Sequence, residues 1–180
     1  RPLPSVDLDW QIAAIADFSG DAKDDILWQQ ASTGKLWLYV MNGLRVEASH
    51  YIATVSDPQW HVVAAGDING DSMADILWQH EQGSIWVYQM NAHHIANSYP
   101  LTTVPDGWAL VAAADFSGDG TADLLWRNRQ TGVNWLYEMS QGQIARSRYI
   151  NTVADQAWQP RQWTDLNLDG QADLLWRHAG

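Results

Sequence analysis

The sequence predicts an all-β fold, a β-propeller built from four-stranded blades of about 49 residues. Three observations support this prediction. Tryptophans recur in phase, since Trp10, Trp60, Trp108 and Trp158 are separated by steps of 50, 48 and 50 residues. An acidic stretch of nine residues recurs at the same spacing. The segments between these markers are short, strand-like and bounded by turn residues.

The first strand of each repeat is expected to run from the first Trp to the acidic stretch, over residues 10–16, 60–66 and 108–114. Alternation along a strand predicts that every second residue shares one face. In the first two repeats these residues are Ile12, Ala14 and Ala16, and Val62, Ala64 and Gly66. Small residues near the acidic stretch are typical of the crowded centre of a propeller.

The remaining strands follow the acidic stretch. The second strand is expected over residues 25–30, 75–80 and 123–128. A turn separates it from a third strand that carries a Trp-x-Tyr-x-Met pattern, beginning at Trp37, Trp86 and Trp135. A second turn, marked by Asn-Gly or Gln-Gly, leads to a more polar fourth strand over residues 46–52, 95–101 and 144–150. Its polarity indicates an outer edge strand.

One propeller domain, complete or partial, is therefore expected over residues 1–180. Its repeats cover approximately residues 10–59, 60–107 and 108–157, with an incomplete fourth at 158–180. Arg1 aligns with Tyr51, so the chain is expected to start as a fourth strand ends, and Gly180 ends a second strand. Such an arc of about three and a half blades is a piece of a longer protein, closes with a second copy, or forms a small irregular ring. We favour the first two outcomes.

The fourth repeat also departs from the pattern. Its first strand has Pro160, Arg161, Gln162, Trp163 and Thr164 where the other repeats have Ala or Val. This composition predicts an atypical capping or interface blade.

The acidic stretch is clearest in residues 115–123, which read D-x-S-x-D-G-x-x-D. Calcium takes six to eight oxygen ligands, often from closely spaced Asp and Asn side chains and a main-chain carbonyl. Asp115, Ser117, Asp119 and Asp123 can supply side chains, and Thr121 its carbonyl. Gly118 and Gly120 permit the positive φ that a tight loop needs.

The same loop occurs four times, so up to four calcium ions are expected. The candidate ligands are Asp17, Ser19, Asp21, Lys23 and Asp25; Asp67, Asn69, Asp71, Met73 and Asp75; Asp115, Ser117, Asp119, Thr121 and Asp123; and Asp165, Asn167, Asp169, Gln171 and Asp173. The alternative is a plain turn or a degenerate former site, because Asp, Asn, Ser and Gly also populate ordinary turns. The loop is not an EF-hand, since its twelfth position is Trp instead of Glu.

Charge and composition exclude several classes of function. The net charge of −11 argues against nucleic acid or an anionic membrane as partner. Most of the acid lies in the four loops, and four calcium ions would reduce the charge to −3. The chain has no Cys, and no apolar run reaches the length of a membrane span. The N-terminus is not typical of a signal peptide, so any such signal is removed or lies outside this chain.

At residues 114–127, Ala-Asp-Phe-Ser-Gly-Asp-Gly-Thr-Ala-Asp-Leu-Leu-Trp-Arg, and at their three copies, the chain resembles the FG-GAP/VCBS repeat family of bacterial and integrin-α propeller blades. The resemblance implies a β-propeller with calcium in the loop between the first and second strands. It also implies a secreted or cell-surface location, in bacteria. The Gly-Ala-Pro that names the family is absent. Ala22, Ser72 and Leu168 stand where Gly is usual.

We therefore expect a non-catalytic, extracellular, calcium-binding module for adhesion or for binding a protein or glycan ligand at a cell surface or matrix. A homodimer that completes the propeller is a possible assembly; nucleic acid and membrane insertion are not expected. An alternative is a lectin-like propeller with Trp/Tyr pockets between blades, although Trp at one phase in every repeat favours packing. Trp163, Trp10 and Trp60 are the candidates for sugar stacking.

A less favoured alternative is part of a secreted hydrolase or lyase acting on polysaccharides. The sequence has no Gly-x-Ser-x-Gly, phosphate-binding loop or HExxH motif, and its acids recur with the loops. His93 and His94 are adjacent, so a strand would direct them to opposite faces, and a solvated turn is expected instead of a metal pair. The other histidines show no ligand spacing.

Overall fold

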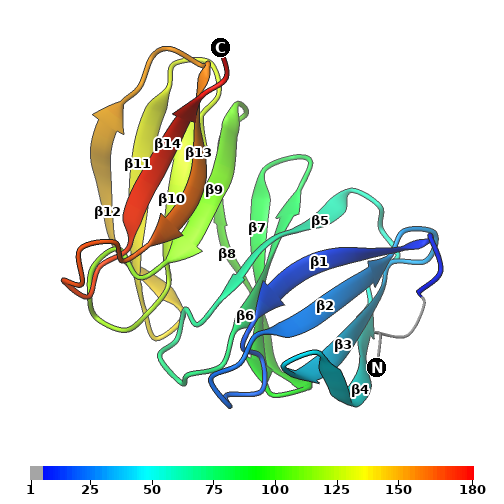
Figure 1. Ribbon diagram of the computed structural model, residues 1–180. Coiled ribbons are helices and arrows are strands. Elements are labelled where there is room, and N and C mark those ends of the chain that lie inside the picture. Colours follow the sequence, from blue (N-terminus) through cyan, green and yellow to red (C-terminus); the bar gives the residue numbers. More distant parts are fainter. Residues whose placement is uncertain (1–5) are drawn as a thin grey trace. The chain divides into compact units, whose positions relative to one another are not determined.

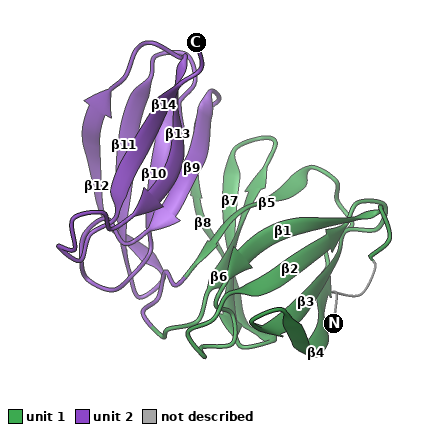
Figure 2. Ribbon diagram, in the orientation of Figure 1, with its two compact units in different colours: residues 1–66, 71–103 green, residues 67–70, 104–180 purple. Residues whose placement is uncertain are grey.

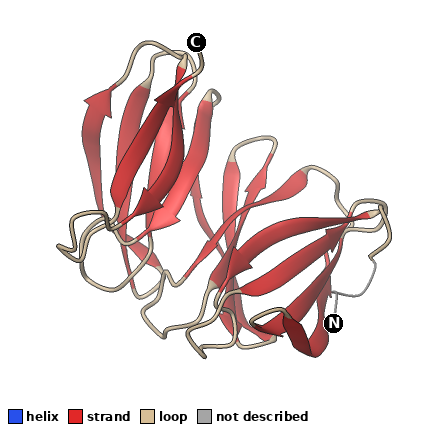
Figure 3. Cartoon of the chain, in the orientation of Figure 1, coloured by secondary structure: helices blue, strands red, loops and turns tan. Residues whose placement is uncertain are grey.

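The computed structural model describes residues 6–180. These residues form β-strands and connecting loops, with no helix among them (Figure 3). None of the described residues therefore forms a helix long and apolar enough to cross a membrane. The all-β prediction is confirmed. The expectation that the first residues end a fourth strand concerns residues 1–5 and lies outside the described part.

The strands form three four-stranded antiparallel sheets and one two-stranded sheet, labelled in Figure 1. The first blade contains β1 (Trp10–Ala16), β2 (Asp25–Gln30), β3 (Lys35–Asn42) and β4 (Arg45–Thr54). The second contains β5 (Trp60–Gly66), β6 (Asp75–His80), β7 (Ser84–Asn91) and β8 (His94–Thr103). The third contains β9 (Trp108–Ala114), β10 (Asp123–Asn128), β11 (Val133–Ser140) and β12 (Gln143–Thr152). The two-stranded sheet contains β13 (Trp158–Thr164) and β14 (Asp173–His178).

Strand order within each four-stranded sheet follows the chain, as in a propeller blade. The first and second strands begin and end at the predicted residues, and the fourth strand lies at an edge of its sheet as predicted. The fourth strands are longer than predicted, because β4, β8 and β12 each span ten residues. The sequence repeat therefore predicts both the order of the strands and which strand lies at the edge of each sheet.

One prediction about strand faces is wrong. Ile12 pairs with Trp28, whereas Ala14 pairs with Leu27, because a β-bulge lies between Ile12 and Ala14. Directly paired residues share a face, and Trp28 and Leu27 point to opposite faces. Ile12 therefore lies on the face opposite to Ala14 and Ala16. A bulge between Val62 and Ala64 has the same effect on the second repeat.

The chain divides into two compact units, coloured separately in Figure 2. Unit 1 contains residues 1–66 and 71–103, with the first and second blades. Unit 2 contains residues 67–70 and 104–180, with the third blade and β13–β14.

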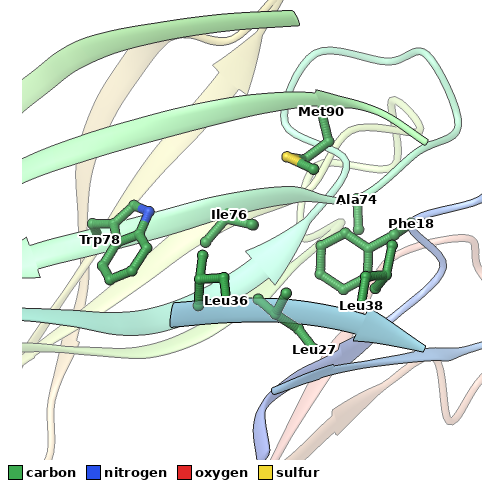
Figure 4. Close-up of a cluster of buried hydrophobic side chains, with 8 residues drawn as sticks. All are labelled: Phe18, Leu27, Leu36, Leu38, Ala74, Ile76, Trp78 and Met90. Carbon is green, nitrogen blue, oxygen red and sulfur yellow. The ribbon is translucent and has the colours of Figure 1, made fainter. Parts of the chain in front are cut away.

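The core of unit 1 lies between its two blades (Figure 4). We call the face of the first blade that carries Leu27, Leu36 and Leu38 its leucine face, and the opposite face, with Trp28, Trp37 and Tyr39, its tryptophan face. The leucine face of the first blade packs against the tryptophan face of the second. The buried members of this layer are Phe18, Leu27, Leu36, Leu38, Ala74, Ile76, Trp78 and Met90. Burying each large apolar side chain contributes about 1.5–3 kcal/mol.

Unit 2 has a smaller core of the same design. Ala112, Leu125 and Leu136 are buried on the leucine face of the third blade, and Leu174 of β14 packs against them. The strand β13 itself is largely exposed, in agreement with the atypical composition of its sequence.

Candidate functional site

The acidic loops connect the first strand of each blade to the second. Their fourth and sixth residues adopt positive φ, as at Gly118 (80°) and Gly120 (87°). The prediction that glycine serves this geometry is confirmed there. Ala22 (62°) and Leu168 (63°) adopt the same conformation without being glycine. Both loops therefore carry the small strain of a side chain in a left-handed turn.

The first Asp of the loop accepts hydrogen bonds from the amides that follow it. In the first loop, Asp17 Oδ1 accepts from the Gly20 N–H at 2.7 Å, and Oδ2 accepts from the Ala22 N–H at 2.7 Å. Asp115 and Asp165 make the equivalent bonds in their own loops. The Gly170 N–H and its neighbours hold the pKa of Asp165 below its ordinary value. The first position thus shapes the turn.

The ninth Asp connects the loop to the third strand. Asp25 is fully buried, and its Oδ2 accepts from the Phe18 N–H while its Oδ1 accepts from the Met41 N–H at 2.8 Å. Asp123 repeats these bonds with Phe116 and Met139. Burial raises the pKa of Asp123, against the opposing effect of these bonds. This second bond joins the end of the loop to the main chain of the third strand, at the Met that ends the Trp-x-Tyr-x-Met pattern.

The fifth Asp of every loop accepts a hydrogen bond from the amide of the seventh residue, and its side-chain partner differs between the first and third loops. Asp21 Oδ2 lies 2.7 Å from Lys23 Nζ, whereas Asp119 Oδ1 accepts from the Thr121 amide and hydroxyl. The hydrogen bond from Lys23 holds the pKa of Asp21 below its ordinary value, and that from Thr121 does the same for Asp119. Lys23, which was predicted as a ligand, therefore places its own positive charge next to Asp21 of the first loop.

The second loop is divided between the two units, with Asp67–Gly70 in unit 2 and Asp71–Asp75 in unit 1. Within unit 2, Asp67 Oδ1 accepts from the Gly70 N–H at 2.6 Å. Within unit 1, Asp71 Oδ1 accepts from the Met73 N–H at 2.9 Å, and Asp75 is buried and accepts from the Met90 N–H. Both parts repeat the bonds seen in the other loops.

Consecutive loops are bonded to one another through their main chains. The Ala74 N–H, at the eighth position of its loop, donates to the carbonyl of Asp17, at the first position of the preceding loop, at 2.7 Å. The same bond joins Ala122 to Asp67 and Ala172 to Asp115, both at 2.6 Å. Sequence reasoning missed this connection. The recurring Ala before the ninth Asp of the last three loops is the signal that could have indicated a packed position.

The donor set of each loop fits a hard divalent cation. Every loop offers three or more carboxylates, a Ser or Asn oxygen at the third position and main-chain carbonyls, the ligands that calcium takes. Each carboxylate oxygen has two lone pairs, so Asp25 Oδ1, with one N–H bond, can accept a further partner. In residues 6–180, however, no three His, Asp or Glu side chains are grouped closely enough to hold an ion.

The histidines and tryptophans give two further results. His93 lies in the turn between β7 and β8, as predicted, whereas His94 is the first residue of β8. The ring of His50 stacks on His93 with centroids 3.8 Å apart. Trp78 and Trp126 are buried in packing, whereas Trp10, Trp37, Trp60 and Trp86 are only half-buried. The predicted packing role therefore describes the Trp of the second strand better than the others.

The acidic loops recur at the connection between the first and second strands of every sheet. This arrangement defines a class of all-β repeat proteins whose repeating unit is a propeller-type blade. A model of the FG-GAP-like repeat matches the chain over residues 17–78, 67–126 and 115–176. Each match begins at the first Asp of one loop and ends at the Trp after the next. The chain belongs to the FG-GAP-like repeat family. A comparison with curated protein sequences found no match.

Proposed function

We propose that the chain is a non-catalytic, calcium-stabilised binding module that acts outside the cell. The observation that carries this proposal is the recurrence of one oxygen-rich loop at the same strand connection in all four repeats. Residues that bind the same ligand in every repeat recur in every repeat. Catalytic residues normally occur in one repeat only and therefore interrupt the pattern.

Calcium would be held by the carboxylates at the first, fifth and ninth positions, the Ser or Asn at the third, and the carbonyl at the seventh. It would supply positive charge where Asp side chains crowd, and would stabilise the folded state because the unfolded chain lacks the assembled loop. The main-chain bond between consecutive loops, such as the one from Ala74 to Asp17, would couple ion binding in one loop to the position of the next loop.

The carboxylates support a structural role over a catalytic one. Asp25 and Asp123 are buried and bonded to main-chain amides, so neither is placed to take a proton from a substrate. The proposed partner is a protein or glycan ligand at a cell surface or matrix. A second copy of the chain is proposed to cover exposed apolar side chains such as Ile12, Ile15 and Leu175.

Isothermal titration calorimetry of the full chain with calcium tests this proposal. We expect saturable binding at more than one site, and weaker binding after Asp115→Asn, which keeps an amide acceptor but removes the charge. Asp106→Asn is the matched control, because Asp106 lies outside the acidic loops. Absence of calcium binding at millimolar concentration would contradict the proposal. A light-scattering mass near 20.2 kDa would contradict only the second copy.

A further inference from the structure

Each complete blade has a pocket at the same place on its tryptophan face. The pocket has a volume of about 330 Å³ in the first blade, 260 Å³ in the second and 230 Å³ in the third. Three Trp and one Tyr line every copy. They are Trp10, Trp28, Trp37 and Tyr39; Trp60, Trp78, Trp86 and Tyr88; and Trp108, Trp126, Trp135 and Tyr137. No residue of an acidic loop lines any of the three.

The aromatic walls are fixed by neighbouring groups. Trp86 Nε1 donates to Ser98 Oγ at 2.8 Å, and the edge of the Trp60 ring meets Trp86 at an interplanar angle of 80°. The same Trp–Ser bond occurs at 2.6 Å in the first blade and 2.7 Å in the third. Side chains held in place before binding lose little conformational entropy when a ligand arrives. The pockets are therefore preorganised.

Packing between the first and second blades leaves part of this pocket accessible. Within unit 1, the leucine face of the first blade covers Trp78, which is 1% exposed. Beside Trp78, the half-buried Trp60 and Trp86 still leave the pocket of the second blade open. The tryptophan face of the second blade thus has a packed part and an accessible part.

The chemistry of the lining selects the ligand. The pockets of the second and third blades contain no charged side chain, so nothing in them pairs with a charged group. Their apolar rings are accompanied by a Tyr hydroxyl, and in the second blade also by the Ser98 hydroxyl. Hydroxyl groups beside apolar rings favour a neutral ligand that has hydrogen-bonding oxygens and an apolar face.

We propose that each complete blade binds one uncharged sugar ring in this pocket, against the half-buried Trp of the first and third strands. The volumes lie at or below the lower end for ligand pockets, which fits one ring better than a larger molecule. Three equivalent sites let one chain bind a polysaccharide several times, so a weak single site becomes a firm attachment. This inference rests on the proposed binding of a glycan and names its site, and it is separate from calcium binding because it uses different residues.

The test is a titration of the full chain, followed by Trp fluorescence and calorimetry, with methyl glycosides of glucose, galactose, mannose, xylose and N-acetylglucosamine. For a ligand of this size we expect a Kd on the order of 1 mM for at least one glycoside. Choline chloride serves as the cationic probe for an aromatic cage. Binding of choline with no glycoside binding would overturn the proposal. The absence of any glycoside binding at a glycoside concentration 100 times the expected Kd would also overturn it.

Variants locate the site. Replacing Trp10, Trp60 and Trp108 together with Ala should weaken glycoside binding at least tenfold, whereas Trp163→Ala, a Trp outside the three pockets, should not change it. Replacing Ser49, Ser98 and Ser147 together with Ala keeps every ring and removes the bond that orients the third-strand Trp of each blade. This variant should weaken glycoside binding a few-fold, and it serves as the test if the triple Trp variant fails to fold. Unchanged binding in a folded triple variant would overturn the proposal. Repeating the titration in chelator separates it from calcium, since the pocket residues need no ion.

Discussion

Gly118 and Gln171 meet at the contact between two consecutive acidic loops. A Cβ atom built on Gly118 would lie 3.1 Å from Gln171 Cγ and 3.6 Å from the Gly170 carbonyl oxygen. Gly20 faces Met73 Cγ at the same 3.1 Å in unit 1. The fourth position of a loop therefore lacks a side chain where the seventh residue of the next loop packs on it. Leu168, at the fourth position of the last loop, is 89% exposed.

This contact predicts unequal effects for two glycines in one loop. Gly118→Ala introduces both a left-handed Ala and a close contact with Gln171. Gly120→Ala introduces the left-handed Ala alone, since nothing lies within 4 Å. We expect about 1 kcal/mol from the backbone in each case, and about 1 kcal/mol more at Gly118. Urea denaturation of both variants measures the difference; equal losses would contradict the packing account.

The lysine of the first loop predicts the order of calcium affinities. Lys23 Nζ lies 2.7 Å from Asp21 Oδ2, so an incoming cation competes with a resident one. Lys23→Thr gives the first loop the residue of the third. We expect calcium affinity at that loop to rise roughly 3- to 10-fold. Calorimetry of this variant, with Lys35→Thr as the matched control outside the loops, makes the measurement. An unchanged affinity would show that Lys23 does not limit the site.

Arg127 predicts a stability difference peculiar to unit 2. It is 3% exposed and donates to the carbonyls of Gly132 and Val153, and its guanidinium lies 5.0 Å from the centroid of Trp176. Arg127→Ala leaves buried carbonyls without donors, and we expect a loss of about 2–4 kcal/mol. Arg127→Gln copies the residue of the first two blades and should cost less. The exposed Arg177→Ala is the control in the same chemical denaturation series.

The histidine stack predicts a pH dependence. Burial, followed by the charges of His50 and His94, lowers the pKa of His93. The folded state therefore binds its proton less readily than the unfolded state. Stability from this group is fully present above the ordinary pKa of about 6.5 and falls as pH drops from there through the folded pKa. Melting temperatures at pH 7.5 and 5.5 should converge in His93→Asn.

His178 has the opposite sign and serves as the comparison. The hydrogen bonds to the Gly180 carbonyl and to Asp155 raise its pKa. Its stabilising effect is present below about pH 6.5 and is lost as pH rises through the folded pKa. His178→Asn should therefore increase the loss of stability at low pH. If both variants shift the pH profile in the same direction, the assignment of the two groups is wrong.

The repeat made most of the fold predictable from sequence. Trp10 and Trp60 mark the starts of first strands, and the acidic loops mark where they end, so the bounds of the first strands could be predicted to the residue. The faces of β1 could not, because the bulge between Ile12 and Ala14 has no signal in an alternating pattern. Bulges depend on pairing with the neighbouring strand, which periodicity within one strand does not encode.

The site was predictable in its residues but only partly in its contacts. Asp at the first and ninth positions was identified by oxygen chemistry alone. Its bonds to loop amides and to the Met41 N–H depend on how the loop folds back over the third strand. The aromatic pockets were predicted only as an alternative, since half-buried and fully buried Trp, such as Trp86 and Trp78, recur with the same period in the sequence.

The most direct test of the calcium account is the melting temperature of the full chain, measured by calorimetry in calcium and in chelator. One loop filled at 100 times its Kd contributes about 2.7 kcal/mol, which corresponds to a rise of roughly 5–10 °C for a chain of this size. We predict at least this rise in calcium, and a smaller one after Asp115→Asn. Equal melting temperatures in calcium and chelator would contradict the account and leave the loops as turns held by their own carboxylates.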